Sequence, residues 1–305
     1  MRRPLIEAGW FEGFVPADFD VGGTTIHART GGTDGAPPLL LLHGFPQTHA
    51  MWHRVAQRLA PQFSLVLADL PGYGDSAKPA DSPDHATQSK RAMAAQLHAL
   101  MLSFGHRRYF VCGHDRGGRV AARLALDRPE AIQRLALIDI APTLDMYAAT
   151  AMDFARLYYH WFHLIQPAPL PENMINGDAV GYLHTKLGRW GGTGLSHVEP
   201  EALAEYERCW ANPATVHAAC EDYRASAGID LEHDRESRAR GDKIACPMLV
   251  LWGERGVVNK LFDPPTLWQA QCAAPVSATR VEAGHYIPEE KPAETAAALA
   301  QFFAG

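Results

Sequence analysis

The chain has 305 residues and a net charge of −6, and 47% of its residues are hydrophobic. This length suits one large α/β domain, or one domain that carries an insertion. The modest negative charge gives no field that favours nucleic acid or an anionic membrane, and no uninterrupted apolar run is long enough to span a bilayer. The five scattered cysteines and the absence of a signal-peptide pattern favour a reducing cytoplasm. We therefore expect a cytoplasmic protein that binds neither nucleic acid nor membrane.

Short apolar runs in the first half of the chain predict the strands of a mostly parallel sheet. Residues 24–29 alternate between apolar and polar, as in an edge strand, whereas later runs are continuously apolar, as in strands buried on both faces. The continuous runs are 38–42, 64–68, 109–111 and 135–138. Helical patterns at 90–104 and 120–126 lie between them, and strands that alternate with helices form parallel sheets with right-handed crossovers.

The pattern changes after residue 142. Residues 143–240 contain aromatic-rich helical stretches and no clear strand, and we interpret them as a helical cap inserted over the sheet. The α/β pattern returns with strands at 248–252 and 277–282 and helices at 264–273 and 293–303. The predicted organisation is therefore a core of 1–142 and 241–305 and a cap of 143–240.

One turn carries the strongest chemical signal. Cys112-Gly113-His114-Asp115-Arg116-Gly117-Gly118-Arg119 follows an apolar strand and opens a helix, and small residues crowd the turn. This is the layout of the nucleophile elbow of an α/β-hydrolase fold, in which a sharp turn presents one side chain above the sheet. The usual serine is replaced by Asp115. A carboxylate is already anionic at pH 7, so it can attack a carbon that bears a leaving group and form an alkyl ester.

The other catalytic residues are expected at the ends of later strands, in the order nucleophile, acid, histidine. His285 follows the last strand and is the candidate that activates water. No aspartate follows the strand at 248–252, so we favour Asp139, at the end of the preceding strand in the sheet, and keep Glu254 as the alternative. Backbone N–H groups of Phe45 and Arg116 would hold the oxyanion formed when water attacks the ester.

Two arginines follow the nucleophile. Arg116 and Arg119 lie three residues apart, so they share one face of the predicted helix. A solvated helix face is the plain explanation, and we expect solvent around Arg123, one turn further on. However, a buried guanidinium without a partner is costly, and a ligand carboxylate would fit its geometry.

Several motifs resemble those of the fluoroacetate (haloacetate) dehalogenases of the α/β-hydrolase superfamily, and the likeness covers nearly the whole chain. The motifs are His43-Gly44-Phe45-Pro46-Gln47, the elbow, His160-Trp161 and Glu221-Asp222-Tyr223-Arg224-Ala225. The first two are shared with epoxide hydrolases, whereas the arginine pair with His160, Trp161 and Tyr223 is more specific. Two departures are Gly118, where alanine is expected, and the segment 255–260.

The resemblance implies roles for these residues. Arg116 and Arg119 would bind the carboxylate of a small anionic haloacid, and His160, Trp161 and Tyr223 would donate hydrogen bonds to the departing halide. We also expect His43, His114 and Trp190 to line the pocket. The family implies a homodimer, and we expect no metal or other cofactor. Without the resemblance, the three cap residues would be interpreted as ordinary cap packing.

Two other functions remain open from the sequence. An epoxide hydrolase would also use an aspartate at the elbow, with Tyr158, Tyr159 or Tyr223 protonating the epoxide oxygen. That function leaves the arginine pair unexplained, and such enzymes usually carry tryptophan where Arg116 stands. A ligand-binding member of the fold without catalysis is the more remote alternative, because fold does not fix function.

Overall fold

The computed structural model describes residues 10–191 and 194–305. Eight strands form one sheet in the order β1-β2-β4-β3-β5-β6-β7-β8. The pairs β1–β2 and β2–β4 are antiparallel and all the others are parallel, which confirms the predicted, mostly parallel sheet. The strands are β1 Val15–Val21, β2 Thr24–Gly32, β3 Pro38–Leu42, β4 Ser64–Ala68, β5 Tyr109–His114, β6 Ile132–Ile138, β7 Met248–Gly253 and β8 Val276–Val281.

The edge strand was predicted at the wrong place. The strand that begins at Thr24 lies inside the sheet, between β1 and β4, and β1 forms the edge. Most of β1 is exposed or half-buried and it contains a proline and two aspartates, so it lacks the apolar run that marks the inner strands. Proline and charged residues are typical of edge strands because they discourage pairing with another sheet.

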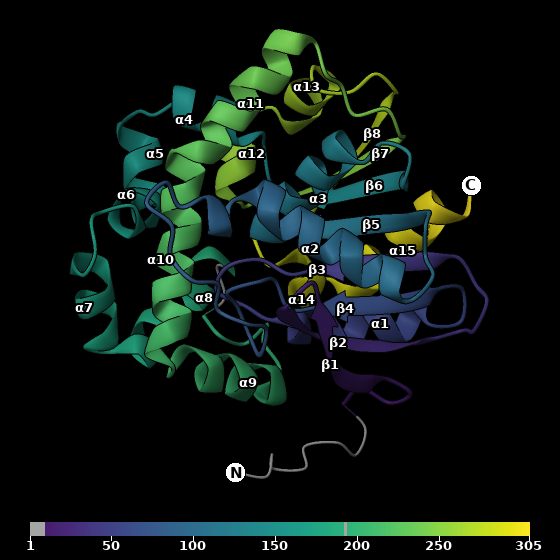
Figure 1. Cartoon of the computed structure of the whole chain (residues 1–305), viewed down its shortest axis with the longest axis horizontal. Helices are drawn as coiled ribbons and strands as arrows, with labels where there is room; N and C mark the ends of the chain where they lie inside the picture. The colour runs from purple at the N-terminus through teal and green to yellow at the C-terminus, as the bar shows by residue number, and fades with distance from the viewer. Residues whose placement is uncertain (1–9, 192–193) are drawn as a thin grey trace.

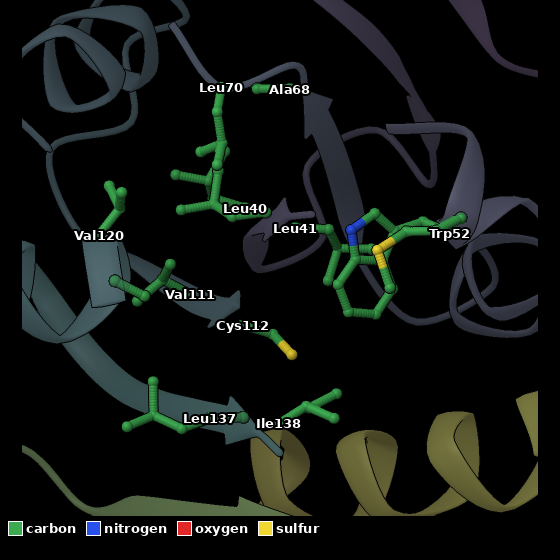
Figure 2. Close-up of a cluster of buried hydrophobic side chains, with 14 of the residues drawn as sticks. Leu40, Leu41, Trp52, Ala68, Leu70, Val111, Cys112, Val120, Leu137 and Ile138 are labelled. Atoms are coloured by element: carbon green, nitrogen blue, oxygen red, sulfur yellow. The ribbon is translucent and has the colours of Figure 1, made fainter. Parts of the chain in front are cut away.

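The centre of the sheet is a buried apolar layer that fixes the positions of the strand ends. Leu40 and Leu41 on β3, Val111 on β5 and Leu137 on β6 are fully buried, and Figure 2 shows them gathered with Trp52. Burial of each such aliphatic side chain contributes roughly 1.5–3 kcal/mol. The residues that follow these strands are therefore held on a rigid frame.

Helices cover both faces of the sheet, with α2 and α3 packed together on one face and α1 and α15 on the other (Figure 1). The core helices are η1 His49–Trp52, α1 His53–Leu59, η2 Ala86–Gln88, α2 Lys90–Ser103, α3 Asp115–Asp127, α12 Val257–Leu261, α13 Pro264–Gln269, α14 Ile287–Glu290 and α15 Pro292–Ala304. None of the helices in the described parts of the chain is long and apolar enough to cross a membrane.

Between β6 and β7 the described residues form helices and no strand, as expected of a helical insertion. Figure 1 shows these helices gathered mainly beyond one end of the sheet. They are α4 Thr143–Ala148, α5 Met152–Leu157, α6 Tyr159–Leu164, α7 Leu170–Asn176, α8 Ala179–Gly191, α9 Pro200–Trp210, α10 Pro213–Ala227 and α11 Ile229–Arg240. The division into core and cap at 142 and 240 stays a prediction.

Candidate active site

The turn between β5 and α3 is a sharp elbow. Strand β5 ends at His114 and helix α3 begins at Asp115, whose φ of +46° lies in the left-handed region that disfavours side chains. Close backbone packing holds this conformation, since a Cβ added to Gly117 would lie 2.2 Å from the His43 carbonyl oxygen. Likewise, a Cβ on Gly44 would lie 2.5 Å from the Asp115 Cβ. Larger side chains would therefore clash at these positions around Asp115, which explains the glycines.

The Asp115 carboxylate is enclosed but charged. Its side chain lies at the end of β5 and the residue is only 8% exposed. The Phe45 backbone N–H donates a hydrogen bond to Oδ1 at 3.0 Å. Burial by itself raises the pKa of this carboxyl, but the nearby His285, His114 and arginine charges outweigh burial and hold it below its ordinary value. The group is therefore an anion at neutral pH, as a nucleophile must be.

His285 and Asp139 form a buried pair beside the elbow. His285 Nδ1 lies 2.6 Å from Asp139 Oδ2, and Asp139 Oδ1 accepts a bond from the Gly253 N–H at 2.9 Å. Burial lowers the pKa of His285, but the bond to Asp139 outweighs it and raises the pKa above its ordinary value. The Nε2 atom faces Asp115 Oδ2 at 3.9 Å, whereas Glu254 is exposed to solvent. The geometry thus favours Asp139 over Glu254 as the acid.

The first arginine of the elbow helix has a partner that the sequence did not reveal. Arg116 Nε donates to Asp222 Oδ2 and Nη2 donates to Asp222 Oδ1, each at 2.7 Å. Tyr73 and Lys90 also donate to this carboxylate. Burial raises the pKa of Asp222, but Arg116 and Lys90 outweigh it and hold the pKa below its ordinary value. The expectation that both arginines lack a protein counter-charge is therefore wrong for Arg116, although its Nη1 has no hydrogen-bond partner among the described residues.

Arg119 fits that expectation. It is 5% exposed, and its Nη1 donates only to the Ala141 carbonyl oxygen at 3.1 Å and the Thr143 hydroxyl at 2.7 Å. In the described ranges no carboxylate forms an ion pair with it, and its Nε has no hydrogen-bond partner. A buried guanidinium with only neutral acceptors is an incomplete arrangement that an anionic ligand would complete.

Arg123 was predicted to lie in solvent, and this is wrong. The residue is 4% exposed because helix α11 covers it. Its guanidinium donates to Asp234 at 2.6 Å and to Ser237 at 3.0 Å, both on α11. The third arginine of the helix therefore joins the core to the end of the inserted segment.

Three cap side chains from α6 and α10 meet above the elbow. The ring of Phe45 stacks on His160, with centroids 5.7 Å apart, and meets Tyr223 edge-on at 5.3 Å. The Arg116 guanidinium carbon lies 4.1 Å from the Tyr223 ring centroid, and that of Arg119 lies 4.8 Å from the Trp161 centroid. The Tyr223 hydroxyl and His160 Nδ1 are buried with no hydrogen-bond partner in the parts of the chain that are described. Polar atoms left in this way are available to a ligand.

The three expected lining residues differ in what they can offer a ligand. The Trp190 ring lies 4.5 Å from that of His160 and 5.8 Å from that of His285, between the cap and the catalytic pair. The ring of His114 lies 4.6 Å from that of His285, and its Nε2 bonds to the His285 carbonyl oxygen. Both nitrogens of His43 bond to backbone groups, so His43 stabilises its loop and offers no free polar atom.

The departure at Gly118 has a visible steric consequence. A Cβ at this position would lie 2.7 Å from Ile140 Cδ1. That atom is the end of a flexible side chain and can shift, but the Cβ would also lie 3.0 Å from the Gly113 carbonyl oxygen, a tight contact with the backbone of β5. That this departure has little consequence for the site stays a prediction.

One buried group of possible metal ligands lies outside the site. Ligand atoms of His27, His49 and Asp69 lie within 4.8 Å of one another. However, His49 Nδ1 bonds to Asp69 at 2.8 Å, and Arg29 Nε donates to His49 Nε2 at 3.1 Å. His27 Nδ1 bonds to Asp18 at 2.6 Å. These bonds account for the cluster as a polar network within the protein.

Comparison with known proteins agrees with this geometry. The family model described as "alpha/beta hydrolase fold" matches residues 37–292. Fluoroacetate dehalogenase from Burkholderia sp is 43% identical, covering 96% of this chain and 94% of that protein, and a soluble epoxide hydrolase from Corynebacterium sp. (strain C12) is 31% identical, covering 93% and 95%. The crystal structure of ALR0039 from Nostoc sp PCC 7120 is 47% identical, with a TM-score of 0.93, and covers 96% of this chain and 99% of that one. The chain therefore belongs to the α/β-hydrolase family, in the group that contains the Burkholderia fluoroacetate dehalogenase.

Proposed function

We propose that this protein is a hydrolytic dehalogenase that converts a small 2-haloacid, such as a haloacetate, into the 2-hydroxy acid and a halide ion. The observation that carries the proposal is the combination of an ionised carboxylate at the elbow with a buried cation, Arg119, that forms no ion pair with a carboxylate among the described residues. The first selects an electrophilic carbon, and the second selects a substrate with a negative charge. The 43% identical fluoroacetate dehalogenase supports this assignment.

In the first step an oxygen of Asp115 attacks the α-carbon and the carbon–halogen bond breaks. The Phe45 N–H holds Oδ1, so Oδ2, which faces His285, is the better candidate for the attacking atom. The carbon–halogen electron pair leaves with the halide, and an ester joins the substrate to Asp115. Arg119, with the unpartnered Nη1 of Arg116, would hold the substrate carboxylate and orient the carbon.

In the second step water breaks the ester. His285 accepts a proton from the water, and the hydroxide attacks the carbonyl carbon of Asp115. Asp139 orients the ring and stabilises its positive charge. The resulting oxyanion on Oδ1 would lie at the Phe45 N–H and, we infer, at the Arg116 N–H as well. Loss of one such donor typically costs roughly 3–4 kcal/mol. Collapse of the oxyanion breaks the bond between Cγ and Oδ2 of Asp115, and Oδ2 leaves on the α-carbon as an alkoxide that takes the proton held by His285. This releases the hydroxy acid, and loss of the remaining water proton from Asp115 restores the carboxylate.

The halide would depart toward the cap. Fluoride is a poor leaving group, so donors aimed at its developing charge lower the barrier of the first step. Tyr223 and His160 carry unpartnered polar atoms there, and Trp161 supplies an indole N–H. A homodimer and a cytoplasmic location stay predictions from the resemblance and the composition.

An epoxide hydrolase is the second candidate, and a specific observation favours it. The Tyr223 hydroxyl is buried without a hydrogen-bond partner in the described ranges and could protonate an epoxide oxygen, and one relative at 31% identity is a soluble epoxide hydrolase. However, an epoxide is neutral and would leave the buried Arg119 without an ion-paired carboxylate among the described residues. A halocarboxylate substrate gives both groups a role, since its carboxylate would pair with Arg119 and its halogen would accept a hydrogen bond from Tyr223.

The decisive experiment compares two products. Halide release from fluoro-, chloro- and bromoacetate is measured beside diol formation from styrene oxide. We expect halide release and little diol, and we expect Asp115→Asn to reduce halide release to the background because the neutral amide cannot displace the halide. Diol formation without halide release would favour the epoxide hydrolase. Neither product from folded protein would favour a ligand-binding role.

A further inference from the structure

Helix α8 carries a buried ammonium group that the mechanism above does not use. Lys186 is 1% exposed, yet in the described ranges no carboxylate forms an ion pair with it and no acceptor bonds to its Nζ. Lysines are almost never fully buried without a partner, because the charge loses its hydration. Such a residue needs an explanation from its surroundings.

Aromatic rings surround the ammonium. Lys186 Nζ lies 3.6 Å from the centroid of Tyr159, 4.8 Å from that of Tyr182 and 5.3 Å from that of Trp190. The negative faces of such rings stabilise a cation, but each by only about 0.5–2 kcal/mol. The rings therefore hold the group in place without neutralising its charge.

The residual charge shows in the pKa values around it. Burial, with a smaller contribution from the charge of Arg189, lowers the pKa of Lys186 to about 7. Burial also lowers the pKa of His160, and the charge of Lys186 is the next largest cause. His163 shows the same two causes in the same order. Both histidines thus sense the positive charge of Lys186, which the Glu172 carboxylate opposes only at His163.

Lys186 lies beside the expected halide site. Its ring neighbour Trp190 is 4.5 Å from His160, and His160 in turn meets Tyr223 at 5.5 Å. His160 Nδ1, Trp190 Nε1 and the Tyr223 hydroxyl are all buried without a hydrogen-bond partner in the described parts of the chain. A cation behind a set of unpartnered polar atoms is the arrangement expected of an anion site.

The two ends of a haloacid differ in when they become charged. The carboxylate is negative throughout, whereas the halogen becomes an anion only as the carbon–halogen bond breaks. A positive charge near the halogen therefore stabilises the transition state and the released halide more than it stabilises the bound substrate, and the developing anion in turn favours the protonated form of Lys186. The low dielectric of a buried site strengthens this effect.

We propose that Lys186 is the counter-charge for the departing halide and acts across the Trp190 and His160 rings without touching the halide. The proposal rests on the proposed dehalogenase function and extends it to a residue in the cap. Lys186 is thus a positioning residue for the electrostatics of the site. Arg119 balances the carboxylate, and Lys186 balances the leaving group.

Halide affinity gives a test that does not depend on catalysis. Bromide or chloride is titrated against the fluorescence of the protein, whose Trp161 and Trp190 flank the expected halide site. We expect Lys186→Met to raise the halide Kd about tenfold, equivalent to about 1.4 kcal/mol. Acetate, which carries only the carboxylate, should retain its inhibition constant within about twofold. Lys186→Arg should restore most of the halide affinity because it restores the charge.

The leaving group gives the second test. We expect Lys186→Met to reduce kcat for fluoroacetate more than kcat for bromoacetate, because bromide depends less on stabilisation as it leaves. Lys260→Met removes the same charge from an exposed position of α12. This control should change neither the halide Kd nor the ratio of kcat for fluoroacetate to kcat for bromoacetate.

Two results would overturn the role of Lys186: an unchanged halide Kd in the folded Lys186→Met protein, or an equal loss of halide and acetate binding. The second would mean that Lys186 only supports packing. Failure of the proposed function looks different, since the wild-type protein would then release no halide from any haloacid while the halide titration still reports on Lys186.

Discussion

The core and the cap contribute to the site in opposite ways. In the core, Asp115, Asp139 and His285 are held by hydrogen bonds from backbone groups and from one another, at the ends of buried strands. In the cap, His160 and Tyr223 present polar atoms that no described protein group satisfies. The reacting atoms are therefore positioned before the substrate binds, whereas the cap side is completed only by a ligand.

This difference assigns the two halves of the reaction to two parts of the fold. Ester formation and hydrolysis need fixed geometry, which the elbow and the strand ends provide. Acceptance of a halide needs unsatisfied donors and positive charge, which the cap provides. Substitutions in the core should affect all haloacids alike, and substitutions in the cap should discriminate between halogens.

The largest effect is expected at the core histidine. With His285→Asn, the first step should proceed and release about one halide per enzyme, after which the ester should persist because nothing deprotonates the water. Rapid quantification of halide and mass spectrometry of the peptide that contains Asp115 would detect both. Several turnovers by this variant would contradict the two-step scheme.

The second largest effect is expected when the ion pair between Arg116 of the core and Asp222 of the cap is removed. Asp222→Asn leaves Arg116 buried without a counter-charge and Lys90 with only Asp230, 3.5 Å away, among the described residues, so the free energy of unfolding should fall by about 3–5 kcal/mol. Urea unfolding measures the change. Asp145→Asn breaks a more exposed pair with Arg238 and should cost at most about 1 kcal/mol. Equal losses in the two variants would show that the burial of Asp222 has no special role.

A smaller, selective effect is expected at the cap tyrosine. Tyr223→Phe removes a hydroxyl donor, and kcat for fluoroacetate should fall about 100-fold, with a smaller loss for bromoacetate. Tyr109→Phe, which removes a hydroxyl that bonds to His98 far from the elbow, is the control and should change neither rate. The same fractional loss for every halogen would argue against donation to the halide.

The smallest effect is a shift in pH dependence. His285 must be neutral to accept a proton, and Asp139 raises its pKa, so ester hydrolysis should weaken on acidification through a value above 6.5. Asp139→Asn removes the stabilising charge and should move this limb of the kcat profile to lower pH. Single-turnover rates of ester hydrolysis from pH 5 to 9 give the position of this limb in the wild-type protein and in the variant. A limb that stays in place would mean that another group controls it.

Local signals were enough to predict the core half of the site. Asp115, Asp139 and His285 each follow an apolar strand, and parallel strands end at the same edge of a sheet, so their meeting could be expected before the structure was known. The edge strand β1 was missed because its polar sequence lacks the apolar run that marks the inner strands.

The contacts of the elbow helix could not be predicted from the sequence. Arg116 meets Asp222 across 106 residues, and Arg123 meets Asp234 across 111 residues. No periodicity or spacing links such distant positions, since the fold of the cap decides which of its residues face the core. The burial of Lys186 could not be predicted either, because a single lysine in a helical pattern is ordinarily a surface residue.

The Arg116–Asp222 pair also limits how the protein can evolve. One residue belongs to the elbow and the other to the inserted segment, so a cap taken from a relative without an acid at this position would bury an unmatched charge. A cap can therefore be exchanged only for one that places an acid against Arg116. We therefore expect the residues at positions 116 and 222 to change together among relatives.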